Sequence, residues 1–141
     1  MPRADDSTVR ALTKAALEAR DRAYAPYSNH PVGAAVLAPN GDIFSAGNVE
    51  NAAYPLGNCA EPGAIAAMVR AGQRKIDTIL IAGPGDVACT PCGGCRQRIA
   101  EFADDQTEII VVDKDGAVLN CFTFDNLLPE AFGKNNVDEM R

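Results

Sequence analysis

Three cysteines and one glutamate lie in two short stretches that could together hold a metal ion and move protons beside it. The first stretch reads Cys-Ala-Glu and the second Pro-Cys-Gly-Gly-Cys; they contribute Cys59, Cys92, Cys95 and Glu61. Three protein ligands leave one tetrahedral position of a zinc ion open, which is the arrangement of catalytic sites. The open position takes a water whose pKa the metal lowers, so the pattern predicts a hydrolytic site in which Glu61 carries protons.

A fourth thiol leaves an alternative open. Cys89 precedes Cys92 by three residues, so the second stretch holds two overlapping Cys-x-x-Cys patterns. With Cys59, these thiols could form a closed structural zinc site, but such a site gives no reason for Glu61. The fifth cysteine, Cys121, lies in a predicted strand, and we expect it to be a small core residue.

The predicted helices explain how the thiols could become ligands. Cys59 opens one predicted helix, and Cys92 and Cys95 open another. A helix N-terminus carries about half a positive charge, which favours the thiolates that zinc requires. Arg96 is a candidate for further positive charge beside the sulfurs.

Three polar residues upstream could be structural or could recognise a ligand. His30 is the only histidine of the chain, and a lone histidine is often a satisfied loop or surface group. Asn48 and Glu50 lie in an irregular loop over residues 47–58, where they could be turn residues. Their hydrogen-bonding capacity also suits recognition of a polyol.

Both helices and strands are predicted around these residues. Apolar periodicity predicts a helix over residues 7–23, capped by Ser7. The remaining elements follow in chain order: strands over 32–38 and 43–46, a helix over 59–71, a strand over 76–82, a helix over 92–103, strands over 107–112 and 117–121, and a helical turn over 124–128.

The order of these elements predicts the fold class. Tight turns at residues 39–42 and 113–116 make the flanking strands antiparallel. Strands interleaved with helices predict an α/β fold, a mixed sheet with helices on both faces. We find no linker and expect a single domain over residues 1–141, with mobile polar tails at 1–6 and 134–141.

Composition narrows the possible partners. The net charge is -6 over 141 residues, and a nucleic-acid site would need clustered Lys and Arg, so we expect no nucleic-acid partner. We find no apolar run of membrane-spanning length and no signal-peptide pattern, so we expect no membrane partner. Five cysteines, three of them suited to a metal, fit a reducing cytoplasm better than a disulfide framework.

The chain resembles the cytidine deaminases, specifically the small pyrimidine nucleoside deaminases with three cysteine ligands. Their wider class is marked by the two metal stretches in this order. The similarity runs from the first predicted helix to Phe132, including Tyr-Ala-Pro-Tyr-Ser at 24–28, Gly-Asn-Val-Glu-Asn-Ala at 47–52 and Leu-Leu-Pro at 127–129. It implies a three-layer α-β-α fold around a five-stranded mixed sheet, one Zn²⁺ per chain, a nucleoside substrate, and a homotetramer with shared active sites.

The resemblance also implies roles for individual residues. Cys59, Cys92 and Cys95 match the zinc ligands, and Glu61 matches the proton shuttle. The matches to substrate-binding positions are Asn48 and Glu50 for the ribose hydroxyls, the backbone of Ala60 for the base, His30 for the wall on which the base packs, and Tyr54 and Phe132 for the pocket of a neighbouring subunit.

Two departures from the family pattern touch this site. Pro62 stands where the family typically has an arginine that helps to neutralise the sulfurs, and His30 stands where it typically has phenylalanine. We therefore expect hydrolytic deamination of cytidine, deoxycytidine or a close analogue. An N4-modified cytidine, a blasticidin-type nucleoside or another amino-heterocycle is the nearest alternative. A non-catalytic, zinc-stabilised nucleoside-binding domain is an alternative of another class.

Overall fold

Five strands form one mixed sheet in this computed structural model, which describes residues 1–139. The strand order is β2-β1-β3-β4-β5, and β3 and β4 are parallel while all other neighbours are antiparallel. The strands are β1 (Gly33–Leu37), β2 (Ile43–Gly47), β3 (Thr78–Ala82), β4 (Glu108–Val112) and β5 (Val118–Thr123). Both predicted tight-turn pairs, β1 with β2 and β4 with β5, are confirmed as antiparallel.

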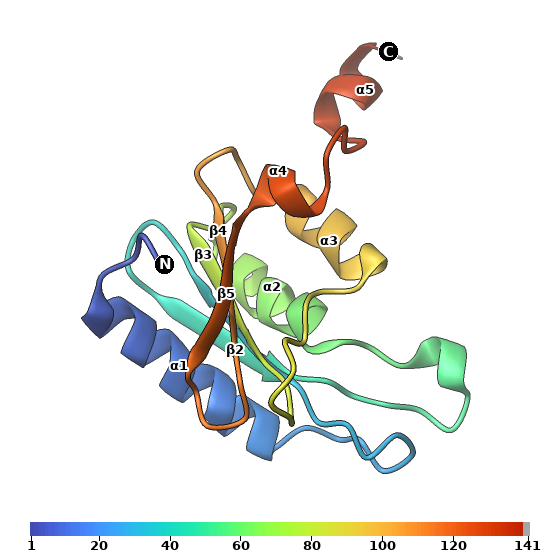
Figure 1. Cartoon of the computed structure of the whole chain (residues 1–141). Helices are drawn as coiled ribbons and strands as arrows, with labels where there is room; N and C mark the ends of the chain where they lie inside the picture. The colour runs from blue at the N-terminus through green and yellow to red at the C-terminus, as the bar shows by residue number, and fades with distance from the viewer. Residues whose placement is uncertain (140–141) are drawn as a thin grey trace.

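Helices cover both faces of the sheet, which confirms the predicted three layers (Figure 1). Helix α1 (Asp6–Asp21) packs on one face, where Leu12 and Ala16 are fully buried against β1, β3 and β4. The opposite face carries α2 (Ala60–Arg70), α3 (Gly93–Ala100) and α4 (Phe124–Leu127). β3 and β4 are buried along their whole length, because they lie in the sheet centre between the two helical layers.

Helix α1 packs very closely against the first residue of β1 and the last residue of β2, which lie at the same end of the sheet. A Cβ built on Gly33 would lie 1.9 Å from the carbonyl oxygen of Ala16, and one built on Gly47 would lie 2.6 Å from that of Ala19. Only glycine allows the helix backbone to approach these strands so closely. The connections that follow α1 and β2 are thereby brought to the same end of the molecule.

Several predicted boundaries differ from the structure. Asp5, not Ser7, caps α1: its Oδ1 accepts from the backbone N–H of Thr8 at 2.8 Å, and the Ser7 hydroxyl donates to the same carboxylate. Helix α3 ends at Ala100 rather than 103, because the next residues enter the turn that leads to β4. The predicted loop over residues 47–58 contains a 3₁₀ turn, η1 (Tyr54–Leu56).

The two predicted tails have structure that composition did not indicate. The backbone N–H groups of Arg3 and Ala4 donate to the buried carboxylate of Glu108 at 2.8 and 3.2 Å. At the other end, α5 (Lys134–Glu139) forms a short helix that projects from the body (Figure 1). Residues 140 and 141 of the predicted C-terminal tail lie outside the described residues.

Candidate active site

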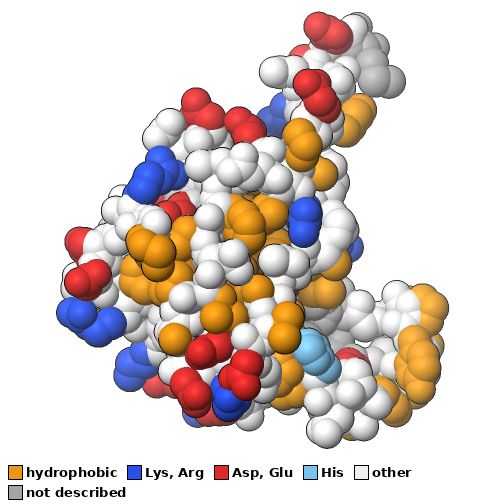
Figure 2. Space-filling model, viewed as in Figure 1, with side chains coloured by type: hydrophobic (Ala, Val, Ile, Leu, Met, Phe, Trp, Pro, Cys, Tyr) orange, Lys and Arg blue, Asp and Glu red, His pale blue; other side chains and the backbone are white. Residues whose placement is uncertain are grey.

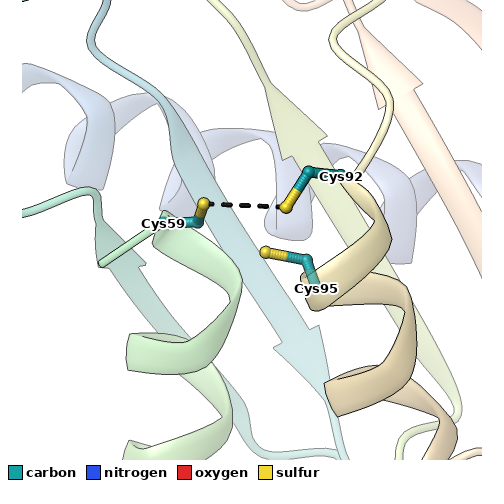
Figure 3. A group of neighbouring side chains, drawn as sticks. All are labelled: Cys59, Cys92 and Cys95. Atoms are coloured by element: carbon teal, nitrogen blue, oxygen red, sulfur yellow. Dashed lines mark hydrogen bonds between the residues drawn. The ribbon is translucent and has the colours of Figure 1, made fainter. Parts of the chain in front are cut away.

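Two helix N-termini bring the three predicted metal ligands together. Cys59 is the N-cap of α2, Cys92 is the N-cap of α3, and Cys95 lies in the first turn of α3. Figure 3 shows the three thiols pointing toward one another from these two helix ends. The ligand atoms of the trio all lie within 4.8 Å of one another.

The size and donor set of this trio fit zinc. A zinc–sulfur bond is about 2.3 Å, so two sulfurs on a tetrahedral zinc ion are about 3.8 Å apart. Sγ of Cys59 and Sγ of Cys92 are 3.9 Å apart. Three soft thiolates select zinc over the hard cations, and three protein ligands leave a fourth position open. Cys89, the thiol of the four-cysteine alternative, is not in the group.

The pKa values of the three thiols in the trio are shifted in different directions. Burial, followed by the nearby Glu61, raises the pKa of Cys95, and burial likewise raises the pKa of Cys59. The pKa of Cys92 is lowered, chiefly because the backbone N–H of Cys95 donates to its sulfur. The helix N-terminus thus favours the thiolate form of Cys92, while binding of a cation must remove the protons of the other two thiols.

Glu61 is a buried acid beside the trio. It lies in the first turn of α2, two residues after Cys59, and its side chain is 4% exposed. Burial raises the pKa of its carboxyl, and a contact with the thiol of Cys95 lowers it in part. A carboxyl whose pKa is raised by burial is suited to holding a proton and passing it on.

Two neighbours of the trio also have clear structural roles. Pro62 lies in the first turn of α2, where its missing N–H costs no helical hydrogen bond. Arg96 donates from Nε to the carbonyl of Pro91 at 2.8 Å and from Nη1 to that of Leu127 at 2.9 Å. It therefore links the α3 entry to α4, and its hydrogen bonds go to carbonyl oxygens rather than to the cysteine sulfurs.

Asn48 and Glu50 lie on one side of an extended segment. Val49 between them forms bridges with Tyr24 and Asn58, and side chains alternate along such a segment. Both polar residues hold the connection between α1 and β1. The Asn48 side chain accepts from Val32 N at 2.9 Å and donates to the carbonyl of His30 at 3.1 Å.

Glu50 binds the same connection through its carboxylate. Oε1 accepts from the backbone N–H groups of Tyr27 and Ser28 at 2.9 and 3.1 Å, and Oε2 accepts from the Ser28 hydroxyl. The Ser28 hydroxyl is the leading cause that lowers the pKa of Glu50. A role for Ser28 could not be predicted from the sequence, because its contact with Glu50 depends on how the connection between α1 and β1 folds back.

A hollow of about 240 Å³ opens beside this network. Six residues line it: Tyr27, Ser28, Glu50, Asn51, Tyr54 and Gly57. The rings of Tyr27 and Tyr54 lie 5.9 Å apart at 56°. None of the three cysteines lines the hollow, so the hollow does not contain the metal trio.

The remaining predicted site residues come from separate parts of the chain and differ in burial. Ala60 is fully buried at the start of α2. His30 is exposed, and its Nε2 lies 4.0 Å from Sγ of Cys89. Tyr54 and Phe132 are 75% and 56% exposed. Cys121 packs beside the core under α1, as predicted.

Membrane-spanning helices are absent from residues 1–139, since none of the helices combines enough length with enough apolar character to cross a bilayer.

Comparison with known proteins agrees with this geometry. The family model described as "Cytidine and deoxycytidylate deaminase zinc-binding region" matches residues 6–112. A cytidine deaminase of Sporosarcina psychrophila is 39% identical over 120 residues, which cover 85% of this chain and 88% of that protein. One of Halalkalibacterium halodurans is 36% identical over 128 residues, 91% of this chain and 96% of that protein.

Solved structures show the same similarity. The crystal structure of cytidine deaminase from Burkholderia pseudomallei matches with a TM-score of 0.81 and 41% identity, covering 87% of this chain and 98% of that one. That of cytidine deaminase from Mycobacterium tuberculosis matches with a TM-score of 0.77 and 32% identity over 92% and 99% of the two chains. The chain described above therefore belongs to the cytidine and deoxycytidylate deaminase family of zinc-binding proteins.

Proposed function

We propose that this chain catalyses the zinc-dependent hydrolytic deamination of cytidine or deoxycytidine to the uridine product and ammonia. The observation that carries the proposal is the trio of cysteines within 4.8 Å of one another together with Glu61, which is 4% exposed beside it. A purely structural zinc site would be closed by a fourth ligand and would not need a buried acid.

The residues of the chain divide the chemistry between them. A zinc ion held by Cys59, Cys92 and Cys95 would act as a Lewis acid that lowers the pKa of a coordinated water. Deamination replaces the amino group on C4 of the base with an oxygen from water, so protons must reach the ring nitrogen N3 and the leaving amine. Glu61 would take the two protons of the water in turn, pass the first to N3 and the second to the amine, and the amine would leave as ammonia when its bond to C4 breaks.

The loop network supports a sugar site at Asn48 and Glu50. A carboxylate has about four acceptor positions, and three of those on Glu50 are occupied by Ser28 and its neighbour. Asn48 retains one N–H that is not used by the loop. One free donor beside one free acceptor suits a single sugar hydroxyl, so we expect ribose and deoxyribose substrates to be used comparably.

The base would lie between the trio and the connection after α1. The backbone at Ala60 begins α2 beside Cys59, where first-turn N–H groups are free to bind a carbonyl oxygen. His30 is carried by the connection that Asn48 and Glu50 hold, so it can form the opposite wall. An imidazole stacks on a pyrimidine as a phenyl ring does, with less apolar area.

A homotetramer with shared active sites completes the proposal. Apolar side chains gather on the arm formed around η1, which projects from the body (Figure 2), and Tyr54 and Leu56 on this arm are 75% and 69% exposed. Phe132 is exposed where the chain leaves the body before α5. Such groups are expected at an interface between copies. Sedimentation of the purified protein measures the number of subunits directly.

We further propose a cytoplasmic location and a place in pyrimidine salvage. A site made of three thiolates requires reduced cysteines, and a reducing compartment supplies that condition. All five cysteines of the chain are free thiols in the structure.

A second candidate keeps the chemistry and changes the base. The polar ring of His30, in contact with Cys89, favours a substrate with an additional polar group, such as an N4-modified cytidine or a blasticidin-type nucleoside. An unpaired polar atom facing plain cytosine would cost about 1–3 kcal/mol. A non-catalytic nucleoside-binding domain is the candidate of another class, and the buried Glu61 argues against it.

Ultraviolet absorbance on mixing with nucleosides separates these candidates. Zinc-replete protein should convert cytidine and deoxycytidine, with ammonia released in equal amount. Conversion of N4-methylcytidine alone would select the second candidate. No conversion of any nucleoside by protein that carries zinc would leave only the binding domain.

A further inference from the structure

A thiol and an imidazole meet at the rim of the proposed active site without belonging to the zinc trio. Nε2 of His30 lies 4.0 Å from Sγ of Cys89. The two residues come from different connections, since His30 lies between α1 and β1 while Cys89 lies between β3 and α3. A thiol is a weak donor and a weak acceptor, so either tautomer of the ring can pair with it.

The backbone of His30 is held in place, which leaves only its ring to be positioned. Its N–H donates to the hydroxyl of Ser28 at 3.0 Å, and its carbonyl accepts from the side chain of Asn48 at 3.1 Å. Ser28 is in turn bound to the carboxylate of Glu50. The orientation of the ring therefore depends on its contact with Cys89.

Packing against the core and against Gly83 holds Cys89 in place. It is half-buried and packs beside the core cluster that lies under α2 and α3. A Cβ built on Gly83 would lie 2.6 Å from Cβ of Cys89, so the thiol rests directly on the glycine backbone. Burial, and then the charges of Glu61 and Cys59, raise the pKa of Cys89. A raised pKa favours the neutral form of the thiol.

We propose that Cys89 is a positioning residue that fixes the His30 ring as a wall of the base site, and that this pair sets which bases the site accepts. The inference rests on the proposed deaminase function. With Nε2 paired to the sulfur, the ring presents its flat face and Nδ1 to a bound base. Without the thiol, Nε2 is unpaired and the ring is free to turn, so the base should bind less tightly while the trio and Glu61 still perform the chemistry.

Nuclear magnetic resonance of the imidazole gives a direct test that does not depend on turnover. His30 is the only histidine, so its ring nitrogen signals need no assignment. In zinc-replete protein at one pH, Cys89→Ala should shift the Nε2 signal, while the control Cys121→Ala, on the far side of the sheet, should not. Addition of uridine, the proposed product, should shift the ring signals as well. Unchanged signals in Cys89→Ala or with uridine would overturn the inference.

Kinetics of four proteins test the specificity role: wild type, His30→Phe, Cys89→Val and the double variant. Cys89→Val should raise KM for cytidine by about 3- to 10-fold, the range for one neutral hydrogen bond, with kcat retained. In the His30→Phe background the same change should have no effect, because the ring then has no nitrogen to pair. The ratio of kcat/KM for cytidine to that for N4-methylcytidine should rise in His30→Phe.

Two outcomes would refute the proposed role of Cys89 and His30 without refuting the deaminase function. An equal effect of Cys89→Val in both backgrounds, or an effect on kcat with KM unchanged, would show that Cys89 does not act through His30. Either result leaves the deaminase function intact. Absence of turnover in zinc-replete wild-type protein would instead refute the proposed function, and the imidazole signals would still report whether the two side chains interact.

Discussion

Replacement of Glu61 by glutamine separates proton transfer from metal binding. The side chain is 4% exposed on the first turn of α2, and glutamine has nearly its shape but cannot carry a proton. Loss of a general acid–base group lowers turnover by about 10²- to 10⁴-fold, which corresponds to about 3–5 kcal/mol of transition-state stabilisation. Zinc content should be unchanged, because the three sulfurs are not altered.

The same variant should change the pH dependence of folding stability in a defined direction. Because burial raises the pKa of Glu61, the unfolded chain releases this proton at lower pH than the folded one. The free energy of unfolding of the zinc-free wild type should therefore fall, relative to Glu61→Gln, as pH rises from the ordinary carboxyl pKa toward the folded one.

The assays are ammonia release, metal analysis and chemical denaturation at several pH values. Glu18→Gln is the matched control, because its side chain is exposed and pairs with Lys14 on the surface of α1, and it should keep full turnover. Turnover in Glu61→Gln within about tenfold of wild type would refute the reasoning, since it would fall short of the loss expected for a general acid–base group.

Three further predictions follow from the trio, the α1 packing and one surface turn. Cys92→Ser should lose zinc while Cys89→Ser keeps it, by metal analysis; equal loss would support the four-thiol site. Gly33→Ala should lower the free energy of unfolding by about 1–3 kcal/mol or more, because the added Cβ would lie 1.9 Å from the α1 backbone. The control Gly85→Ala should leave the free energy of unfolding unchanged, because the space around Gly85 is open. The pKa of Asp104 is lowered by a backbone N–H of its own turn and then by a lysine ammonium. Asp104→Asn should therefore lower Tm at neutral pH, and the difference in Tm from wild type should vanish as pH falls through the pKa of this carboxyl in the folded protein. An equal difference in Tm at every pH would contradict this attribution.

Much of the fold could be predicted, because the apolar pattern and the turns of the sequence agree with the burial and pairing of the strands. A strand was predicted over residues 76–82, where 79–82 are all apolar, and β3 is buried along its whole length. The turn after β4 predicted an antiparallel last strand, and β5 pairs in that way. α5 was missed because its residues, Lys-Asn-Asn-Val-Asp-Glu, carry no apolar period.

The metal trio could be predicted because its members lie close to one another in the chain or open predicted helices. Cys92 and Cys95 are three residues apart, and Cys59 caps the helix beside them. The contact of Cys89 with His30 spans 59 residues, and that of Ser28 with Glu50 spans 22. Such contacts depend on the path of irregular connections, which neither periodicity nor motif spacing determines.

Metal removal and restoration in one preparation tests the central claim most directly. Protein as purified should contain about one zinc per chain and release one ammonia for each cytidine consumed. Chelation should abolish both zinc content and ammonia release, and one equivalent of Zn²⁺ should restore both. Ammonia release that continues in zinc-free protein, or zinc that returns without any release, would contradict the account.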